Sequence, residues 1–320
     1  MAAVSSGFTP AANKLGHQRV ALLVMAAFFM LAPLVVYPVF MMKVMCFALF
    51  ACAFNLLIGF GGLLSFGHAM FLGTAGYISA YAAKAWGFTP ELAILLATAA
   101  AAALGLLTGL LAIRRQGIYF AMITLALAQM VFFFYLQAPF TGGEDGIQSV
   151  PRGKLFGLID LNSNFAMYVF VLVIFLGGFL LIYRVVHSPF GQVLKAIREN
   201  ESRAISLGYA VERYKLLAFV LSAALSGLAG ATKALVFQLA SLTDAHWSMS
   251  GEVVLMTLLG GLGTIFGPVA GAAIIVAMEN YLSQLGAWVL VVQGVIFVVC
   301  VLAFRRGVIG EIAHAIKKPL

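Results

Sequence analysis

The chain has 320 residues, of which 63% are hydrophobic and only 9% are charged, and its mean hydropathy is +1.06. This composition excludes a water-soluble globular domain and is typical of an integral membrane protein. The formal net charge of +8 does not indicate nucleic-acid binding, because the basic residues are scattered at the ends of apolar runs.

Apolar runs long enough to cross a bilayer follow one another along the chain. About 20 apolar residues in a helix cross a bilayer core of roughly 30 Å, so there is room for about eight to ten spans. The predicted spans are 19–40, 42–60, 68–86, 91–113, 117–137, 165–186, 214–238, 251–266, 269–285 and 288–304. We therefore expect an all-α, polytopic membrane bundle whose first span is retained rather than cleaved.

The distribution of Lys and Arg predicts the orientation of this bundle. With the tail 1–18 in the cytoplasm, 14 of the 19 basic residues lie on the cytoplasmic side. They are Lys14, Arg19, Arg114, Arg115, Arg184, Lys195, Arg198, Arg203, Arg213, Lys215, Arg305, Arg306, Lys317 and Lys318. The loop 187–213 and the tail 305–320 are then cytoplasmic, and Lys43 lies outside.

The longest loop on the other side runs from 138 to 164 and contains TGGEDG, Thr141 to Gly146. Its glycines predict a tight acidic turn with positive φ angles. One interpretation is a solvated hairpin cap, and the other is a docking element for a partner that arrives from outside. The docking residues would be Gly142, Gly143, Glu144 and Asp145.

Two glycine-rich stretches, 59–76 and 260–271, interrupt the predicted spans. Broken backbone at membrane depth is tolerated only where it is buried in protein or lines a cavity. We therefore expect glycine-broken helices and assign candidate path or gating residues to the breaks. They are Gly61, Gly62, Ser65, Gly67, His68, Gly260, Gly261 and Gly263. Small residues elsewhere, among them Gly105 and the ridge of Ser222, Ser226 and Gly230, predict close helix packing.

A few ionisable side chains fall inside predicted spans, where each is costly. His68 either lines the path or bonds a backbone carbonyl. Lys233 is interpreted as extending to the membrane surface, and Glu252 as an acid near a helix N-terminus. A pair between Lys233 and Glu279 is possible, whereas Asn55 is interpreted as an interhelical hydrogen-bond partner.

Catalytic interpretations find little support in the sequence. No carboxylate pair, His-Glu-x-x-His or Cys/His cluster stands where a membrane enzyme would need it, and the three cysteines lie in apolar runs. The stretch 227–233, GLAGATK, lacks the Gly-Lys-Ser/Thr ending of a phosphate-binding loop and lies inside a span. We therefore expect no catalytic residues, metal or cofactor, and a source of energy outside the chain.

The one long charged segment, from 187 to 215, predicts an amphipathic helix between spans. Ser188 suits its N-cap, Pro189 its first position and Gly208 its end. Glu199 and Arg203 are spaced for an ion pair on this helix. The apolar face comprises Phe190, Val193, Leu194 and Ile197, and the polar face comprises Lys195, Arg198, Glu199 and Ser202. The polar face needs a partner.

Five blocks, in order, resemble the permease family of branched-chain amino-acid ABC importers. They are Gly61–Tyr77, Arg114–Met130, Thr141–Ile147, Ser188–Tyr209 and Met249–Ala272. The resemblance covers the chain from about residue 40 to 310. It implies a bacterial inner-membrane permease that pairs with a homologous permease and two cytoplasmic ATP-binding subunits. It also implies that a periplasmic substrate-binding protein delivers the substrate.

The resemblance also implies a Glu-Ala-Ala-x3-Gly motif, whose helix docks into a groove of the ATP-binding subunit. The matching positions are Ser202, Arg203 and Ala204, followed by Gly208, while the nearest glutamate, Glu201, stands one residue early. The implied coupling residues are Lys195, Arg198, Glu199, Glu201, Arg203, Ala204 and Gly208.

Three alternatives stay open. The same architecture imports urea, short amides or small carboxylates, because cargo choice rests largely with the binding protein. An ion-coupled secondary transporter needs no docking helix and usually carries an intramembrane acidic site. A membrane enzyme should show clustered polar residues at one face. Copurification of an ATPase separates the importer from the last two.

Overall fold

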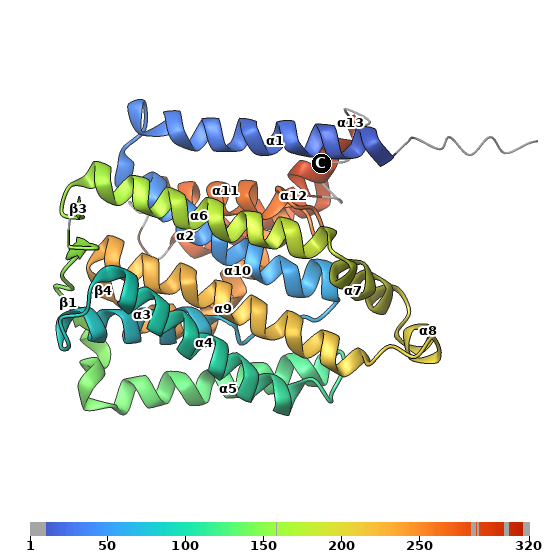
Figure 1. Cartoon of the computed structure of the whole chain (residues 1–320), viewed down its shortest axis with the longest axis horizontal. Coiled ribbons are helices and arrows are strands. Elements are labelled where there is room, and N and C mark those ends of the chain that lie inside the picture. Colours follow the sequence, from blue (N-terminus) through green and yellow to red (C-terminus); the bar gives the residue numbers. More distant parts are fainter. Residues whose placement is uncertain (1–10, 158, 283–285, 287, 304–306, 316–320) are drawn as a thin grey trace, which may run out of the picture.

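The computed structural model describes residues 11–157, 159–282, 286, 288–303 and 307–315, and it shows a helical bundle (Figure 1). The helices that form the bundle are α1 (Ala11–Leu31), α2 (Pro38–Asn55), α3 (His68–Lys84), α4 (Pro90–Ala112), α5 (Ile118–Gln137), α6 (Asn164–His187), α9 (Val211–Phe237), α10 (Trp247–Gly260), α11 (Gly267–Leu282) and α12 (Trp288–Ala303). Short helices α7 (Pro189–Glu199), α8 (Glu201–Ser206) and α13 (Val308–Ala315) and the 3-10 turn η1 (Ala32–Leu34) complete the helical part.

One end of the bundle carries α7 and α8, and the opposite end carries short strands (Figure 1). We call them the α7 end and the β end. At the β end lie β1 (Ile147–Gln148), β2 (Lys154–Leu155), β3 (Ile159–Asp160) and β4 (Leu239–Ala240), with the 3-10 turns η3 (Pro139–Thr141), η4 (Gly143–Asp145) and η5 (Leu242–Ala245). Strand β1 pairs with β4 and β2 with β3, both antiparallel.

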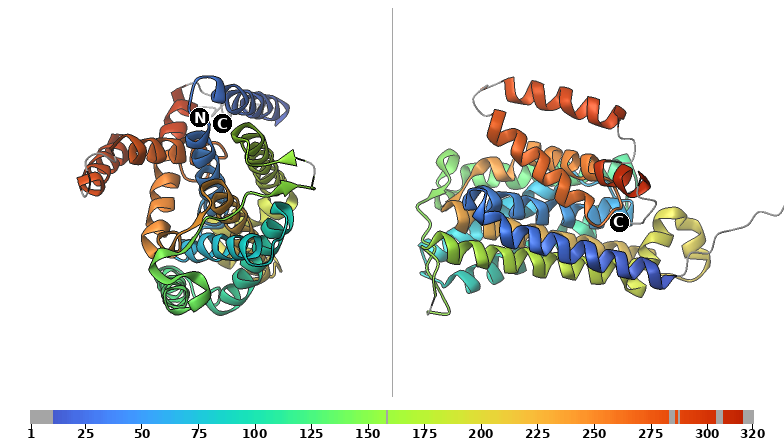
Figure 2. Two further views of the ribbon diagram at one scale, coloured as in Figure 1. Left: turned by 90° about the vertical axis from the view of Figure 1, so that its left-hand side faces the viewer. Right: turned by 90° about the horizontal axis from the view of Figure 1, so that it is seen from above.

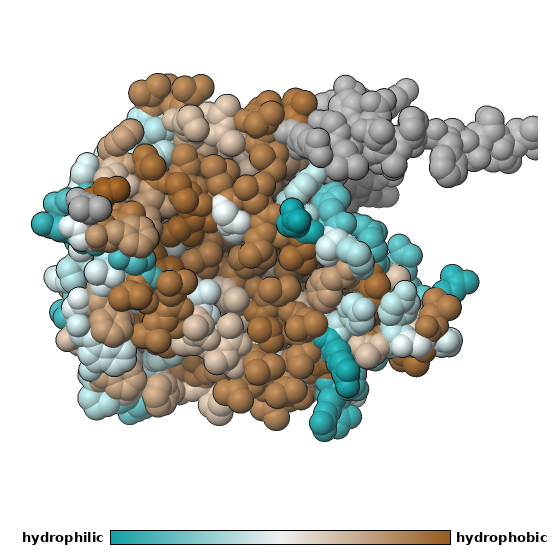
Figure 3. All heavy atoms as spheres, in the orientation of Figure 1, coloured by the Kyte–Doolittle hydropathy of each residue, from teal (hydrophilic) through white to brown (hydrophobic). Residues whose placement is uncertain are grey.

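A helix lies at each of the ten predicted spans, which confirms the predicted polytopic helical fold. Within the described ranges, five helices are long and apolar enough to cross a membrane, namely α2 with its continuation, α4, α5, α6 and α9. Among the others, α10 has 14 residues and α11 has 16, while α1 has 21 residues and its apolar part is shorter. Apolar side chains form a belt over the visible face, with hydrophilic residues at both ends (Figure 3).

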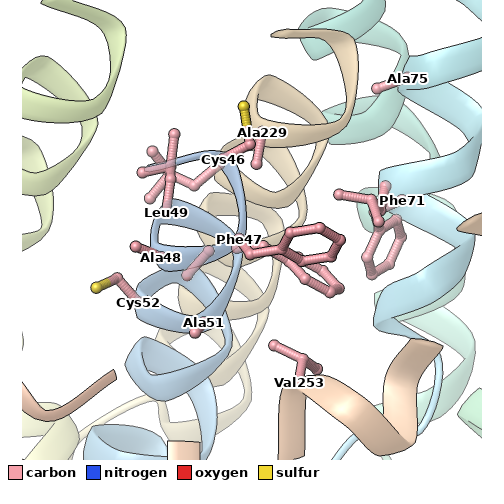
Figure 4. Packing of buried hydrophobic residues seen from close by; sticks show 14 of the residues in the cluster. Cys46, Phe47, Ala48, Leu49, Ala51, Cys52, Phe71, Ala75, Ala229 and Val253 are labelled. Carbon is pink, nitrogen blue, oxygen red and sulfur yellow. The ribbon is translucent and has the colours of Figure 1, made fainter. Parts of the chain in front are cut away.

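Helices α2 and α9 form the centre of the bundle. Phe47 points from α2 toward Phe71 of α3, with Ala229 of α9 alongside (Figure 4). Helix α12 lies at the edge, beside α11 (Figure 2). The predicted small-residue packing is confirmed, because a Cβ on Gly230 would overlap the Leu72 carbonyl and one on Gly105 would lie 2.5 Å from the Ala223 Cβ.

The charged segment forms two helices, so the prediction of a single helix ending near Gly208 is wrong. Asn200 adopts an extended conformation, with φ −157° and ψ 99°, and its side-chain oxygen accepts a hydrogen bond from the Arg203 N–H at 2.9 Å. An asparagine that caps a new helix in this way ends the previous one. Glu199 and Arg203 therefore lie on different helices, and the ion pairs found in the described ranges do not include them.

The loop 138–164 forms the predicted tight turn at the β end. Gly142, Gly143 and Gly146 have φ angles of 77°, 59° and 66°, as the sequence predicts. The Thr141 hydroxyl donates to the Tyr135 carbonyl at 2.6 Å and fixes the turn to the end of α5. The tails 1–10 and 316–320, and Arg305 and Arg306, lie outside the described residues.

Candidate functional site

The first glycine break is a stretch of irregular backbone that runs back into the bundle. Helix α2 continues as a π-helix, η2 (Leu56–Phe60), and α3 begins only at His68. Side chains of other helices satisfy the N–H groups around the break. The Phe66 N–H donates to the Thr124 hydroxyl at 3.2 Å, and the Ala69 N–H donates to the Ser250 hydroxyl at 2.9 Å. Neighbouring helices thus satisfy broken backbone inside an apolar bundle.

The second break, between α10 and α11, contacts the first break through Asn55. The Asn55 amide nitrogen donates to the Thr264 carbonyl at 2.8 Å, and its amide oxygen accepts from the Gly263 N–H at 3.0 Å. A Cβ on Gly59 would lie 2.7 Å from the Gly263 nitrogen. Glycine at position 59 therefore permits the two breaks to touch, and the interpretation of Asn55 as an interhelical partner is confirmed.

Helix α7 contacts the same point from the side. The Arg198 guanidinium donates from Nη1 to the Gly59 carbonyl, and a Cβ on Gly62 would lie 3.0 Å from the Arg198 Cγ. We call Asn55, Gly59, Arg198, Gly263 and Thr264 the glycine junction. It joins three parts of the chain that are far apart in the sequence.

Lys195 also faces the bundle, because its ammonium lies 5.4 Å from the centroid of the Phe60 ring. Burial lowers the pKa of this lysine. Arg198 is exposed, as its place on the polar face predicts, but the head groups of Lys195 and Arg198 also contact the first break, which the sequence did not indicate. The Gly59 carbonyl and the ring of Phe60 attract these cations, because a carbonyl oxygen accepts hydrogen bonds and an aromatic face attracts positive charge.

Two cavities flank the glycine junction. The first, about 480 Å³, is lined by Phe60, Lys195, Arg198, Glu199 and Gly263. The second, about 420 Å³, lies between the first break and the start of α5 and is lined by Gly62, Leu63, Leu64, Phe66, Gly117, Ile118, Phe120, Ala121, Met122 and Leu125. The first contains charged groups and the second is apolar. Gly62, which lines the apolar cavity, lies directly against Arg198.

The predicted path residues lie in and beside these breaks. Ser65 is buried, and its hydroxyl accepts from the Gly67 N–H at 3.2 Å. A Cβ on Gly61 would meet only the Leu194 side chain, at 3.7 Å. In the second break, a Cβ on Gly260 would overlap the Gly267 carbonyl, and Gly261 has a φ of 122°.

His68 is buried and lines neither cavity at the junction. Its Nε2 lies 2.8 Å from the Ser222 hydroxyl oxygen, and that hydroxyl donates to the Ala53 carbonyl at 2.6 Å. Nε2 must therefore carry the proton and donate it to Ser222. The expected bond to a backbone carbonyl is indirect, because the Ser222 hydroxyl stands between the ring and the Ala53 carbonyl. The surrounding rings include Phe54, at 4.9 Å between centroids.

The remaining predicted coupling residues divide into buried and exposed ones. Glu201 pairs with Lys215 at 2.7 Å, and the lysine side chain is only 5% exposed. Ala204 is buried against Ile197, whereas Glu199, Arg203 and Gly208 are exposed. Three exposed apolar side chains that the predicted coupling set does not include lie beside Arg203. They are Ile205, Leu207 and Tyr209.

The predicted docking residues lie at the β end, opposite the junction (Figure 1). Glu144 and Asp145 are exposed, and the pairing of Ile147 with Ala240 in β1 and β4 fixes the turn. A Cβ on Gly142 would overlap the Gly146 carbonyl, which explains glycine there. The turn thus presents two carboxylates on a rigid support.

Two expectations for ionisable groups inside spans are wrong. Lys233 does not extend to the surface, because its ammonium pairs with Asp244 in η5 and both side chains are largely buried. Glu279 pairs with Lys43 at 3.1 Å rather than with Lys233. Across the part of the chain that the structure describes, no group of three His, Cys, Asp or Glu residues could hold a metal ion.

Comparison with known proteins places these features in a family. Residues 38–301 match the family described as "Branched-chain amino acid transport system / permease component". The high-affinity branched-chain amino acid transport system permease protein LivM of Escherichia coli (strain K12) is 28% identical over 288 residues, covering 83% of this chain and 68% of the relative. LivM of Salmonella typhimurium is 27% identical over the same shares.

Another relative, whose name gives ribose as its cargo, matches a smaller part of the chain. The ribose import permease protein RbsC of Bacillus subtilis is 31% identical over 174 residues, which are 47% of this chain and 52% of RbsC. No solved structure matches the chain.

Proposed function

The chain belongs to the family of permease components of branched-chain amino acid transport systems, and we propose that it forms the translocation path of an ATP-driven importer for branched-chain, hydrophobic amino acids. A homologous permease forms the other half of the path. The present chain is a transport subunit and not an enzyme, so two separate ATP-binding subunits hydrolyse the ATP. A periplasmic substrate-binding protein delivers the cargo.

In this proposal the α7 end faces the cytoplasm and the β end faces the periplasm of a bacterial inner membrane. The tails 1–18 and 305–320 lie in the cytoplasm, and 19–304 form the membrane domain. The distribution of Lys and Arg supports this orientation. The exposed carboxylates of Glu144 and Asp145 then face the binding protein, and 187–213 face the ATP-binding subunits.

One observation carries the mechanism: the helix that projects from the bundle donates a hydrogen bond to the backbone of the first glycine break and lies against the second. Arg198 donates to the Gly59 carbonyl, and a Cβ on Gly263 would lie 3.3 Å from the same guanidinium nitrogen. A displacement of α7 therefore acts on α2, α10 and α11 together. A helix attached to the bundle only by flexible loops could not move these three helices together.

The ATP-binding subunit docks on α8 and the end of α7. Ile205, Leu207 and Tyr209 offer exposed apolar area there, and Glu199 and Arg203 offer charges of both signs. The buried ion pair between Glu201 and Lys215 fixes α8 to α9, so docking force reaches the bundle. Closure of the two ATP-binding subunits then moves the halves of the permease as rigid bodies.

In this proposal the apolar cavity binds the cargo and changes its shape when α7 moves. Its volume of about 420 Å³ falls in the usual range for small-molecule sites, and its lining is apolar. Gly62 belongs to its wall and rests on Arg198, so movement of α7 changes the shape of the cavity. An apolar wall suits the side chain of leucine, isoleucine or valine.

The test uses the importer reconstituted in liposomes with its partner permease, ATP-binding subunits and binding protein. We expect Arg198→Gln to lower the leucine transported per ATP hydrolysed by about tenfold, which corresponds to about 1.4 kcal/mol, the low end for a charged hydrogen bond. Arg184→Gln removes the same charge from an exposed position at the end of α6 and serves as the control. Equal coupling ratios in the two variants would contradict this role of Arg198.

A second variant tests the docking surface. Charge reversal in the double variant Glu199→Arg, Arg203→Glu should uncouple ATP hydrolysis from uptake, because both side chains are exposed near the apolar residues in and after α8. Unchanged coupling would count against docking at this surface. Transport by the purified chain alone would instead support an ion-coupled transporter and overturn the whole proposal.

The cargo has alternatives on the same architecture, namely urea, short amides and small carboxylates. Ligand screening of the binding protein encoded beside this chain separates them from hydrophobic amino acids. Binding of leucine, isoleucine or valine supports the proposal, and binding of urea or acetate alone overturns the cargo while leaving the importer mechanism in place.

A further inference from the structure

Five ionisable side chains gather inside the half of the bundle nearest the β end. They are Lys43 of α2, Lys233 of α9, Asp244 of η5, Glu252 of α10 and Glu279 of α11. We call this set the charge cluster. Ionisable groups in a membrane domain are costly to bury, so a cluster drawn from five elements indicates a function beyond packing.

The charge cluster is organised around two ion pairs and one ring. Lys43 pairs with Glu279 at 3.1 Å, and Lys233 pairs with Asp244. Both ammonium groups lie near the Phe47 ring, at 5.8 Å and 5.2 Å from its centroid. Glu252 of α10 interacts electrostatically with Glu279 and with both lysines, so it belongs to the same cluster.

A pocket of about 380 Å³ opens next to this cluster. Its lining consists of Val35, Val36, Tyr37, Val39, Phe40, Lys43, Phe237, Asn280 and Tyr281. Lys43 is the charged member of the lining, and its ion-pair partner Glu279 directly precedes Asn280. The pocket therefore combines apolar walls with Lys43, and the Glu279 carboxylate lies 3.1 Å from the Lys43 ammonium, next to the lining; the two side chains remain 28% and 22% exposed.

We propose that this pocket binds the amino acid zwitterion before it reaches the apolar cavity. The Lys43 ammonium binds the α-carboxylate, and the Glu279 carboxylate, with Glu252 beside it, binds the α-ammonium. The apolar side chain lies against Val39 and Phe40. This inference rests on the proposed import of hydrophobic amino acids.

The chemistry of the pocket favours a zwitterion over the other cargo classes. Urea and short amides carry no charge and gain nothing from a pair of opposite ions. A small carboxylate would bind Lys43 but leave the Glu279 carboxylate without a partner. An amino acid replaces the internal ion pair by two new ones, so the charges stay paired throughout passage. Because one ion pair is lost when the new pairs form, the net gain in free energy is small, which suits a site that must also release its ligand.

The experiment measures protection of a single cysteine at the pocket. In the complete importer in liposomes, Cys46, Cys52 and Cys300 are first replaced by alanine, and Tyr281→Cys is introduced at an exposed lining position. An impermeant thiol reagent is added without ATP, in the absence of the binding protein. We expect L-leucine to slow the labelling several-fold, and leucinamide, 4-methylpentanoate and urea to leave the rate unchanged.

Substitutions then test the ion pair itself. Lys43→Gln and Glu279→Gln should each remove the protection by leucine, while labelling without leucine continues at its usual rate and shows that the pocket persists. Lys233→Gln is the control, because this lysine pairs with Asp244 and lies outside the lining, and protection should remain.

Three results would overturn the inference. Labelling unaffected by leucine shows an empty pocket, and equal protection by leucinamide shows that the α-carboxylate is not recognised. Protection that follows the phosphatidylglycerol content of the liposomes instead of leucine identifies a lipid headgroup site. ATP-driven uptake of labelled leucine, with the binding protein added, separates the two proposals. Uptake without protection overturns this pocket alone, and absence of uptake overturns the proposed cargo.

Discussion

The two ends of the bundle connect the same central helices by different means. At the α7 end, Asn55 and Arg198 join the breaks through hydrogen bonds to backbone groups, and glycines remove every Cβ that would intervene. At the β end, Lys43 and Lys233 join the helices through ion pairs. The contact at the α7 end depends on the close fit of backbone groups, and the contact at the β end depends on the pairing of opposite charges.

The two regions should therefore tolerate different substitutions. A junction of backbone groups at van der Waals contact has no room for an added carbon, whatever its polarity. Ion pairs occupy more space and tolerate changes of size, but they respond to an uncompensated charge. The α7 end therefore transmits movement as a rigid contact, while the pairs at the β end can exchange partners.

The largest effect is expected for Gly59→Ala. The new Cβ would overlap the Asn55 side-chain oxygen and lie 2.7 Å from the Gly263 nitrogen, so the breaks must separate. We expect a loss of about 3 kcal/mol or more in stability, as for severe overpacking combined with lost buried hydrogen bonds. The measurement is the midpoint of thermal unfolding of the purified complex in detergent.

Gly61→Ala is the control for that change. Its Cβ would meet only the Leu194 side chain, at ordinary contact distances of 3.7 to 3.8 Å. The two substitutions add the same methyl group two residues apart. A similar loss from both would show that the glycines act through helix flexibility rather than through contact between the breaks.

A smaller effect is expected for Asn55→Ala. This change removes both hydrogen bonds to the second break and leaves the Gly263 N–H and the Thr264 carbonyl without that partner. Two part-buried backbone groups without partners cost about 2 to 3 kcal/mol together. Hydrogen exchange at Gly263, followed by mass spectrometry, should rise with the fall in unfolding midpoint. Unchanged exchange there would contradict the contact between the breaks.

Next in size is the removal of one charge at the β end. Glu279→Gln leaves Lys43 without its partner, and we expect a loss of about 1 to 2 kcal/mol, less than for a fully buried pair because the side chains keep some exposure. The exchanged pair Lys43→Glu, Glu279→Lys should regain most of this stability. A pair that depended on shape, like the glycine junction, would not recover on exchange.

The comparison also explains what the sequence could predict. Spans, breaks and the ridge of Ser222, Ser226 and Gly230 follow from local patterns, because apolar length and small-residue spacing act within one helix. The contact between the breaks, 59–62 and 261–264, does not, since it depends on how α10 and α11 fold back onto α2. Nothing local to Asn55 indicates that its partners lie more than 200 residues away.

The partners of the charged residues could not be predicted from the sequence for the same reason. The sequence places Lys233 in a span, but its partner Asp244 lies in a turn beyond the helix, and Glu279 reaches Lys43 from 236 residues away. On α7 the polar face was identified, yet its direction was not. The carbonyl of the buried residue Gly59 attracts Arg198 toward the bundle, and carbonyls carry no signature in the sequence.

The smallest expected effect tests the helix break that the sequence analysis missed. Asn200→Ala removes the side-chain bond to the Arg203 N–H, which costs about 1 kcal/mol, whereas Asn200→Asp keeps an acceptor there and should be close to neutral. Alanine also favours continuation of α7 into α8, which would bring Glu199 and Arg203 four positions apart on one helix. Coupling of ATP hydrolysis to uptake should then fall more than stability does, because α8 would leave its position against α9. Equal coupling in the alanine and aspartate variants would show that the break is not needed to orient the docking surface.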